Sequence, residues 1–300
     1  MSQKIIHIQP DDLIFEVPPG IGDISWVYSK LHLLPRKIGF RILTIGTNRA
    51  LPFVNLLPGI DNLGYGNKYR ENENWLDPNV DLSQLPAGTY KLMLNPSLES
   101  GMKLADAFPK QETNYHYPIN TTQRHKTQAK HILDSLHGWP KIGFYCSSHV
   151  NAVWQINEWI QFLTYLNNMF PELGLVAIGA SYDDLTEEVY EMALKMGFNI
   201  VSAVGDCEIG ATIEILKKLD YFVAYPSGLA ILADVVDTPC LMFYWKNYHD
   251  KFLDTYADPI NISTGRHLNR LFCSVEEATQ IFAEKSVPWI KIPSSKSAMA

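Results

Sequence analysis

The chain has 300 residues, of which 46% are hydrophobic and 19% are charged, and its formal net charge is −7. This length suggests about two domains, and the composition is that of a globular protein with an ample core. The acidic balance disfavours a dedicated nucleic-acid binder, which carries a basic face. No apolar run reaches the roughly 18 residues of a membrane span, which leaves only peripheral contact with a membrane.

The N-terminus and the cysteines predict a cytoplasmic protein. Residues 1–4 lead into a strand-like run rather than into a signal-peptide core. The four cysteines (Cys146, Cys207, Cys240 and Cys273) are far apart and form no Cys-x-x-Cys pair. Free thiols in a reducing compartment are the simplest expectation, with Cys146 and Cys240 buried in apolar strands.

The first half of the chain alternates strand-like and helix-like segments. Residues 61–90 are rich in Asn, Asp, Gly and Pro and are predicted to be irregular, and the polar residues 110–124 are predicted to be a linker. The predicted strands are residues 5–8, 13–17, 41–45 and 91–94, and the predicted helices are residues 24–34 and 49–57.

The second half repeats this alternation and ends in a helix that Ser274 and Glu277 begin in a capping-box pattern. The predicted strands are residues 141–146, 174–179, 199–201, 221–224 and 240–244, and the predicted helices are residues 157–169, 183–196, 212–219 and a short segment after Ser227. Strands that alternate with helices predict parallel sheets. We therefore expect an α/β protein of two doubly wound Rossmann-like domains that face a central cleft. Their expected bounds are 1–125 and 126–300, and the last helix could pack back on the first domain.

The turn Ser227-Gly228-Leu229 lies between an apolar strand and a short helix. Backbone N–H groups at a helix start have no partner inside the helix, and the helix dipole there favours anions. We expect a diphosphate to bind at this helix start. The alternative is a serine cap that only starts the helix.

A second turn, Gly20-Ile21-Gly22-Asp23, also joins a strand to a helix. It opens like the dinucleotide fingerprint Gly-x-Gly-x-x-Gly, but Ser25 occupies the third glycine position, so nicotinamide binding is disfavoured. Asp23 is either a helix cap or a catalytic carboxylate that takes a proton from an attacking hydroxyl. The two glycines would let a substrate approach closely.

These motifs resemble those of the heptosyltransferase-like glycosyltransferases, family nine, which have the GT-B fold. The resemblance covers most of residues 13–245 and is strongest in the second half. The matching segments are Gly22-Asp23-Ile24, residues 144–148 with the following Trp154 and Trp159, Val176 to Gly179, Pro226 to Ala233, and Pro239 to Phe243.

The resemblance implies an inverting sugar transfer that needs neither a metal nor a cofactor, from a nucleotide-diphosphate sugar to an acceptor hydroxyl. Asp23 would deprotonate the acceptor, which is expected to be a glycan or glycolipid bound by the first domain, and nucleic acid is disfavoured. The sequence has no Asp-x-Asp, the metal-binding motif of the other main glycosyltransferase fold. The implied donor-binding residues in the second domain are Ser147, Ser148, His149, Trp154, Gly179, Ser227, Gly228 and Leu229, and the implied acceptor-binding residues are Gly22, Asn95 and Glu99.

The sequence departs from the family at the donor site. Pro226 and Ile231 replace the family's Asp and His, and Ala152 stands where the family often has Lys. His149 could replace part of the lost contact, although a lone loop histidine is more often only solvated. Two alternatives therefore stay open: a nucleotide-sugar epimerase-like enzyme, and a non-catalytic nucleotide- or sugar-binding descendant.

Overall fold

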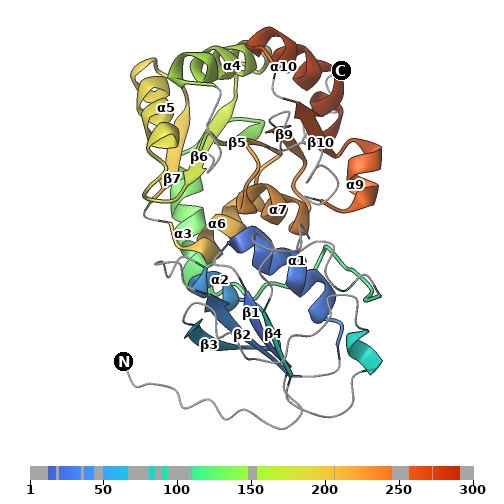
Figure 1. Cartoon of the computed structure of the whole chain (residues 1–300). Coiled ribbons are helices and arrows are strands. Elements are labelled where there is room, and N and C mark those ends of the chain that lie inside the picture. The colour runs from blue at the N-terminus through green and yellow to red at the C-terminus, as the bar shows by residue number, and fades with distance from the viewer. Residues whose placement is uncertain are drawn as a thin grey trace, which may run out of the picture. The chain divides into compact units, whose positions relative to one another are not determined.

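The chain folds into two compact units, Met1–Asn120 and Thr121–Ala300, each with its own parallel sheet (Figure 1). The structure is a computed structural model, and its described residues are 13–17, 20–34, 37–43, 50–66, 81–84, 90–93, 108, 110–147, 154–205, 207–244, 257–271 and 273–290. The strand-like run at residues 5–8 lies outside them.

The first unit has a four-stranded sheet with the order β3-β2-β1-β4. Its chain order reverses at β1, because the chain first moves outward through β2 and β3 and then returns to add β4 on the other side of β1. Ligands of such sheets bind at the carboxyl ends of the strands at this switch point. The strands are β1 (Leu13–Val17), β2 (Ile38–Leu43), β3 (Ile60–Gly66) and β4 (Tyr90–Met93), and the helices are α1 (Ile21–Leu31), α2 (Leu51–Val54) and a 3-10 turn at Leu82–Gln84.

Helix α1 directly follows β1 and is held by the segment before the second unit. The side chains of residues 24–31 are all buried. The Tyr117 hydroxyl donates to Ser25 Oγ at 2.8 Å, and its ring lies edge-on to Tyr28 at 4.9 Å. Tyr117, within the predicted linker 110–124, thus packs against α1, and the division between the two units at Asn120 and Thr121 lies in the same segment.

The second unit has a six-stranded sheet with the order β10-β9-β8-β5-β6-β7. All its strand pairs are parallel, and the switch point lies between β5 and β8. The strands are β5 (Lys141–Tyr145), β6 (Gly174–Gly179), β7 (Ile200–Val204), β8 (Tyr221–Ala224), β9 (Cys240–Tyr244) and β10 (His267–Leu271), and the helices are α3 (Gln123–Asp134), α4 (Ile156–Met169), α5 (Asp184–Lys195), α6 (Ile209–Leu216), α7 (Gly228–Val235), α9 (Pro259–Thr264) and α10 (Val275–Ile281), followed by Phe282–Ser286 and Val287–Trp289.

Aromatic side chains form the core of the second unit. Helix α4 buries Trp159, Phe162 and Leu166, whose helical spacing places them on one face. Phe282, just after α10, packs its ring against Phe162 and Tyr221 at 6.0 and 5.3 Å, and α10 itself packs against α4. The last helix thus completes the core of its own unit.

The expected α/β architecture with doubly wound parallel sheets is confirmed, and β6, β8 and β9 have the predicted bounds. Cys146 and Cys240 are free and buried, as expected. Among the described residues, two strands and two α-helices were not predicted. The expected irregular region contains β3, whose sequence includes two glycines, and the expected boundary contains α3, which buries only Ala129 and Leu133. The polar strand β10 and the six-residue α9 also lack the apolar pattern that would have indicated them.

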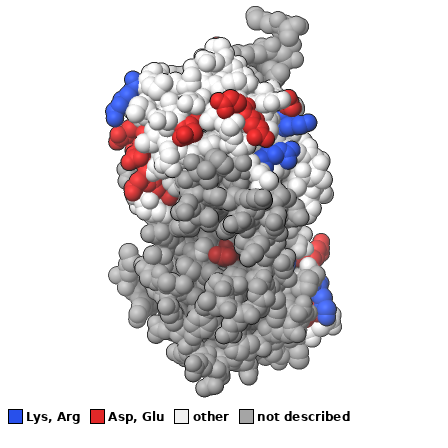
Figure 2. Space-filling model, turned by 45° about the horizontal axis from the view of Figure 1, so that its top comes forward, with Lys and Arg blue, Asp and Glu red and all other residues white. Residues whose placement is uncertain are grey.

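None of the described helices is both long and apolar enough to cross a membrane. Figure 2 shows acidic side chains grouped on the described part of one face, with lysine and arginine at its margins. This arrangement accords with the net charge of −7.

Candidate functional site

The switch point of the second unit lies between β5 and β8, which lead into the loop of Ser147 and the turn of Ser227. Tyr145 at the end of β5 is in register with Ala224 at the end of β8, and the Tyr225 N–H donates to the Tyr145 carbonyl at 3.3 Å. Neighbouring strands lie about 4.8 Å apart. Ser147 follows Tyr145 by two residues and Ser227 follows Ala224 by three, so the Ser147 loop and the turn that starts α7 leave neighbouring strands at the same edge of the sheet.

The α7 start has the features of an anion site. Ser227 has extended backbone angles, and its Oγ accepts the Ala230 N–H at 3.3 Å. The N–H groups of Gly228 and Leu229 precede the first intrahelical hydrogen bond, so by helix geometry they are available to a ligand. Ser227, Gly228 and Leu229 are half-buried, whereas the helix from Ala230 to Val235 is buried. The predicted cap and the predicted anion site are therefore compatible at this one turn.

A buried polar network ties the loop after β5 to the loop after β6. Asp183 is the N-cap residue of α5, yet its carboxylate does not cap that helix. Its Oδ1 accepts from the Tyr145 hydroxyl at 3.2 Å, and its Oδ2 accepts from the Ala180 N–H at 2.5 Å. Thr186, in the first turn of α5, accepts the Cys146 N–H through Oγ1 at 3.1 Å, and the same oxygen lies 3.3 Å from Ser147 Oγ.

Gly179 lies against this network. A Cβ atom at Gly179 would approach Asp183 Oδ2 at 3.0 Å and Asp183 Cβ at 3.2 Å. The Gly179 carbonyl accepts the N–H of Gly205 at 3.2 Å, and Gly205 has a φ of +81°. The small size of Gly179 thus lets Asp183 fold back over the end of β6, at the turn where the nucleoside is expected.

Trp154, a predicted donor contact, packs in the core of the second unit. Its side chain is 2% exposed, its indole Nε1 donates to the Cys273 carbonyl at 3.0 Å, and its backbone N–H donates to the Tyr225 hydroxyl at 3.0 Å. The ring packs on Trp159 and Phe243, each at 5.1 Å. The two expected donor ligands next to Ser147 in this loop, Ser148 and His149, lie outside the described residues.

In the first unit, Asp23 lies in the first turn of α1, directly after β1 and therefore at the switch-point edge of that sheet. Desolvation by burial raises the pKa of its carboxyl group from 3.8 to about 6. The part of the chain that the structure describes supplies no ion pair or hydrogen bond to it. Gly22 is half-buried next to it, and the other expected acceptor contacts, Asn95 and Glu99, lie outside the described residues.

The departures from the family motif are also visible at α7. Pro226 is buried before the turn, and Ile231 is 4% exposed. Ile231 therefore contributes to the core, and it does not replace a polar donor contact. Ala152, at the position of the family's lysine, lies outside the described residues.

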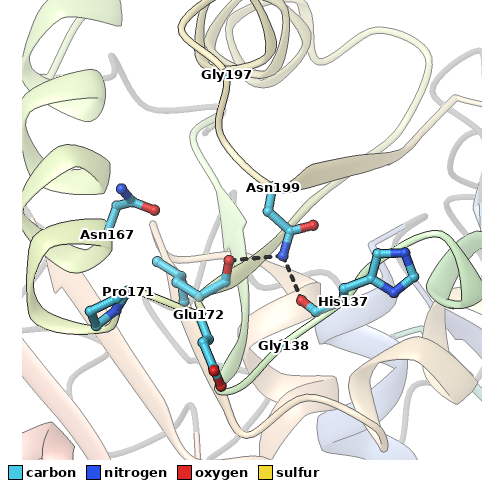
Figure 3. A pocket seen from close by; sticks show the side chains of 8 residues that line it. His137, Gly138, Asn167, Pro171, Glu172, Gly197 and Asn199 are labelled. Atoms are coloured by element: carbon cyan, nitrogen blue, oxygen red, sulfur yellow. Dashed lines mark hydrogen bonds between the residues drawn. The ribbon is translucent and has the colours of Figure 1, made fainter.

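The described residues contain no cluster of three or more His, Cys, Asp or Glu side chains that could hold a metal ion. They do form an open hollow of about 630 Å³, lined by His137, Asn167, Glu172 and Asn199 among others (Figure 3). These residues precede β5, β6 and β7 or end α4, so the hollow lies at the amino ends of the strands. The Asn199 side-chain amide donates to the carbonyls of His137 and Leu173. It thereby links the segments that lead into β5, β6 and β7. The hollow is thus at the edge of the sheet opposite Ser147 and α7.

Sequence reasoning did not identify Thr186, Asp183 and Tyr145 as parts of the site. The one available signal was that Asp183 begins a predicted helix, which suggests a cap rather than a partner of Tyr145. Residues 145 and 183 are brought together only by the pairing of β5 with β6.

No protein-family model and no curated protein matches this sequence. Among solved structures, the chain is similar to the E. coli ADP-heptose LPS heptosyltransferase II, with a TM-score of 0.62, 13% identity, and 93% of this chain and 98% of that chain covered. It is also similar to the glycosyl transferase family 9 protein from Veillonella parvula, with a TM-score of 0.55, 12% identity, and coverage of 80% and 83%. A third similar structure is the E. coli heptosyltransferase WaaC with ADP, with a TM-score of 0.53, 12% identity, and coverage of 91% and 99%.

The predicted resemblance is thus confirmed at the level of the fold. The chain has the GT-B fold of these glycosyltransferases along almost its whole length. At 12–13% identity, the similarity establishes the shared fold and leaves the reaction to the residues of the site.

Proposed function

We propose that this protein is a glycosyltransferase that moves a sugar from a nucleoside-diphosphate donor to an acceptor hydroxyl, with inversion and without a metal ion. The observation that carries this proposal is the half-buried Ser227-Gly228-Leu229 turn at the start of α7, at the switch point of the sheet between β5 and β8. Anions bind at helix N-termini, and ligands of doubly wound sheets bind at switch points. The shared fold with heptosyltransferases supports the same assignment.

The donor half of the reaction depends on the second unit. The N–H groups of Gly228 and Leu229 would donate hydrogen bonds to the diphosphate oxygens, and the Ser147 hydroxyl would donate from the loop after β5. These donors would stabilise the negative charge that develops on the diphosphate as the bond between the sugar carbon and phosphate oxygen breaks. The turn after Gly179 would border the nucleoside.

The acceptor half depends on Asp23 in the first unit. Its carboxylate would take the proton of the acceptor hydroxyl while the acceptor oxygen forms a bond to the anomeric carbon. The leaving diphosphate would carry away the electron pair of the broken bond, and one displacement of this kind inverts the anomeric centre. The raised pKa of about 6 makes Asp23 a stronger base than an ordinary aspartate while it remains mostly ionised at neutral pH. We expect the acceptor to be a glycan or glycolipid, Gly22 to border it, and the reaction to take place in the cytoplasm.

A thermal-shift panel of ADP, GDP, UDP, CDP and dTDP, with and without magnesium, tests the donor site. The two solved heptosyltransferases are named for or contain ADP-linked compounds, so ADP is the first probe. A ligand at a hundred times its dissociation constant adds about 2.7 kcal/mol, which raises the melting temperature by a few degrees. Stabilisation by one diphosphate without magnesium is the expected result, and no shift with any of the five would overturn the proposal.

Asp23→Asn separates a transferase from a non-catalytic binder. A transferase loses sugar transfer in this variant but keeps its affinity for the diphosphate, because Asp23 is proposed to act on the acceptor. A protein that binds the diphosphate but shows no transfer to any hydroxyl acceptor, with or without the substitution, would be the non-catalytic descendant. Consumption of the nucleotide sugar without an acceptor would indicate an epimerase.

A further inference from the structure

Thr186 connects the backbone of the β5 loop with the hydroxyl of Ser147. Its side chain is 0% exposed, and its Oγ1 accepts the N–H of Cys146 at 3.1 Å. The same Oγ1 lies 3.3 Å from Ser147 Oγ. A threonine hydroxyl has one proton to donate. Because its oxygen already accepts from a backbone N–H, the proton is left for a second neighbour.

Two neighbours compete for the Thr186 proton: Ser147 Oγ and the nearby Cys146 thiol. Sulfur is the weaker acceptor, so donation to the Ser147 oxygen is favoured. The hydrogen bonds then run in one direction, from the Cys146 N–H through Thr186 to Ser147. Each bond in such a chain strengthens the next. The last proton, that of Ser147, is left to be donated outside the network.

The ligand that matches this arrangement is one that only accepts hydrogen bonds. A diphosphate at the α7 start is such a ligand, and Ser147 follows β5, the strand paired with the β8 strand that leads into that start. We propose, on the basis of the donor site proposed above, that Thr186 is a positioning residue that fixes Ser147 as a hydrogen-bond donor to the diphosphate.

Asp183 anchors the other end of this hydrogen-bond network. Its carboxylate accepts from the Tyr145 hydroxyl and the Ala180 N–H instead of capping α5. The first turn of α5, which carries Thr186, is thereby anchored to β5 and to the loop after β6. The phosphate side and the nucleoside side of the donor site are thus held by one network.

A double-mutant cycle tests the role of Thr186. The probe is whichever of ADP, GDP, UDP, CDP and dTDP binds the full-length wild type most tightly, measured by isothermal titration calorimetry. Ser147→Ala is expected to weaken binding about tenfold, the loss of one hydrogen bond to a charged group. Thr186→Val, which keeps the shape but loses the hydroxyl, should give a similar loss, and the double variant should be no weaker than either single variant. Thr186→Ser restores the hydroxyl and should bind within about twofold of wild type.

Thr238→Val is the matched control. Thr238 is also buried, and its hydroxyl donates to the Leu216 carbonyl at 2.7 Å, before β9 and hence at the amino edge of the sheet. This variant should lower the melting temperature and leave the affinity for the diphosphate unchanged.

The inference is overturned if the double variant loses about a hundredfold, if Thr186→Ser binds as weakly as Thr186→Val, or if Ser147→Ala binds like wild type. Wild-type affinity in Ser147→Ala overturns the inference even when the Thr186→Val variant does not fold. A wild type that binds none of the five diphosphates overturns the proposed function itself, so the two failures are distinguishable.

Discussion

The carboxylate of Asp23 folds back over Gly20, so that a Cβ atom at Gly20 would lie 2.3 Å from Asp23 Oδ2. Gly20 is the N-cap residue of α1 and has ordinary extended backbone angles. A side chain at this position would therefore displace the carboxylate, whereas the backbone conformation itself tolerates one. The glycine keeps open the place that Asp23 occupies.

Gly20→Ala should remove most of the transfer activity and leave the fold intact. Alanine tolerates a φ of −86° and a ψ of 134°, and at an N-cap it is less favourable than glycine by about 1 kcal/mol or less. Its Cβ, however, must displace the Asp23 carboxylate from its position. Turnover with the donor found in the diphosphate panel, together with the melting temperature, measures both effects. An alanine variant with wild-type turnover would show that the position of the carboxylate is not critical.

The pH dependence of sugar transfer should follow the ionisation of the Asp23 carboxyl group. The base must be ionised, and its pKa is raised to about 6, so kcat/KM is expected to fall as the pH drops through about 6. Below that point each pH unit should lower the rate about tenfold. A rate profile over acidic to neutral pH measures the inflection. An inflection near 4, the ordinary range of a carboxyl group, would contradict the assignment.

Asp23→Asn should stabilise the protein at neutral pH. The folded pKa of about 6 exceeds the unfolded value of 3.8, so folding is most favourable when the group is protonated, below 3.8. Stability is lost as the pH rises from 3.8 through about 6, by at most about 3 kcal/mol and less for a partly exposed group. Asparagine is always neutral and escapes this loss. Melting temperatures should therefore favour the variant near pH 8 and converge near pH 4, and a variant less stable near pH 8 would refute this expectation.

Substitutions at Ser227 should separate helix capping from ligand binding. Ser227→Ala removes the acceptor of the Ala230 N–H and should cost about 1 kcal/mol of stability. Ser227→Asp keeps a capping oxygen but adds a negative charge where the diphosphate is proposed to bind. It should retain stability and lose diphosphate binding by more than tenfold.

Ser274 provides the matched control for this prediction. It caps α10 in the same way, with its Oγ accepting the Glu277 N–H at 3.2 Å. Ser274→Ala and Ser274→Asp should reproduce the stability changes without any change in diphosphate affinity. If Ser227→Asp binds the diphosphate as tightly as wild type, the ligand does not lie at α7.

His267→Leu should stabilise the protein, most strongly in acid. His267 on β10 is 1% exposed, and neither ring nitrogen has a hydrogen-bond partner among the described residues. Burial lowers its pKa from 6.5 to about 3, so wild-type stability is lost as the pH falls from 6.5 toward 3, by about 1.4 kcal/mol for each pH unit. Leucine removes both the unpaired polar atoms and this pH dependence. Melting curves at pH 5 and 8 measure the difference, with the exposed His131→Leu as control, and a variant that is less stable at both pH values would contradict the prediction.

The sequence by itself determined the doubly wound α/β class and the two turns that matter most. Apolar strands such as Tyr221–Ala224 are buried on both faces of a parallel sheet, so their apolar runs stand out, and the Ser227-Gly228 turn after β8 follows the local rules of helix capping. Elements that bury few apolar side chains escaped prediction. Helix α3 buries only Ala129 and Leu133, and β10 is a polar edge strand.

Only the tertiary structure decided which side chains surround these turns. Trp154 follows the β5 loop in sequence but is buried in the core, because its aromatic ring and indole N–H both find partners there. Asp183 and Thr186 lie in the site because strand pairing brings the ends of β5 and β6 together across nearly forty residues of chain. The pKa of Asp23 likewise depends on how deeply α1 is buried, and burial is a property of the packed unit and not of the turn that carries the residue.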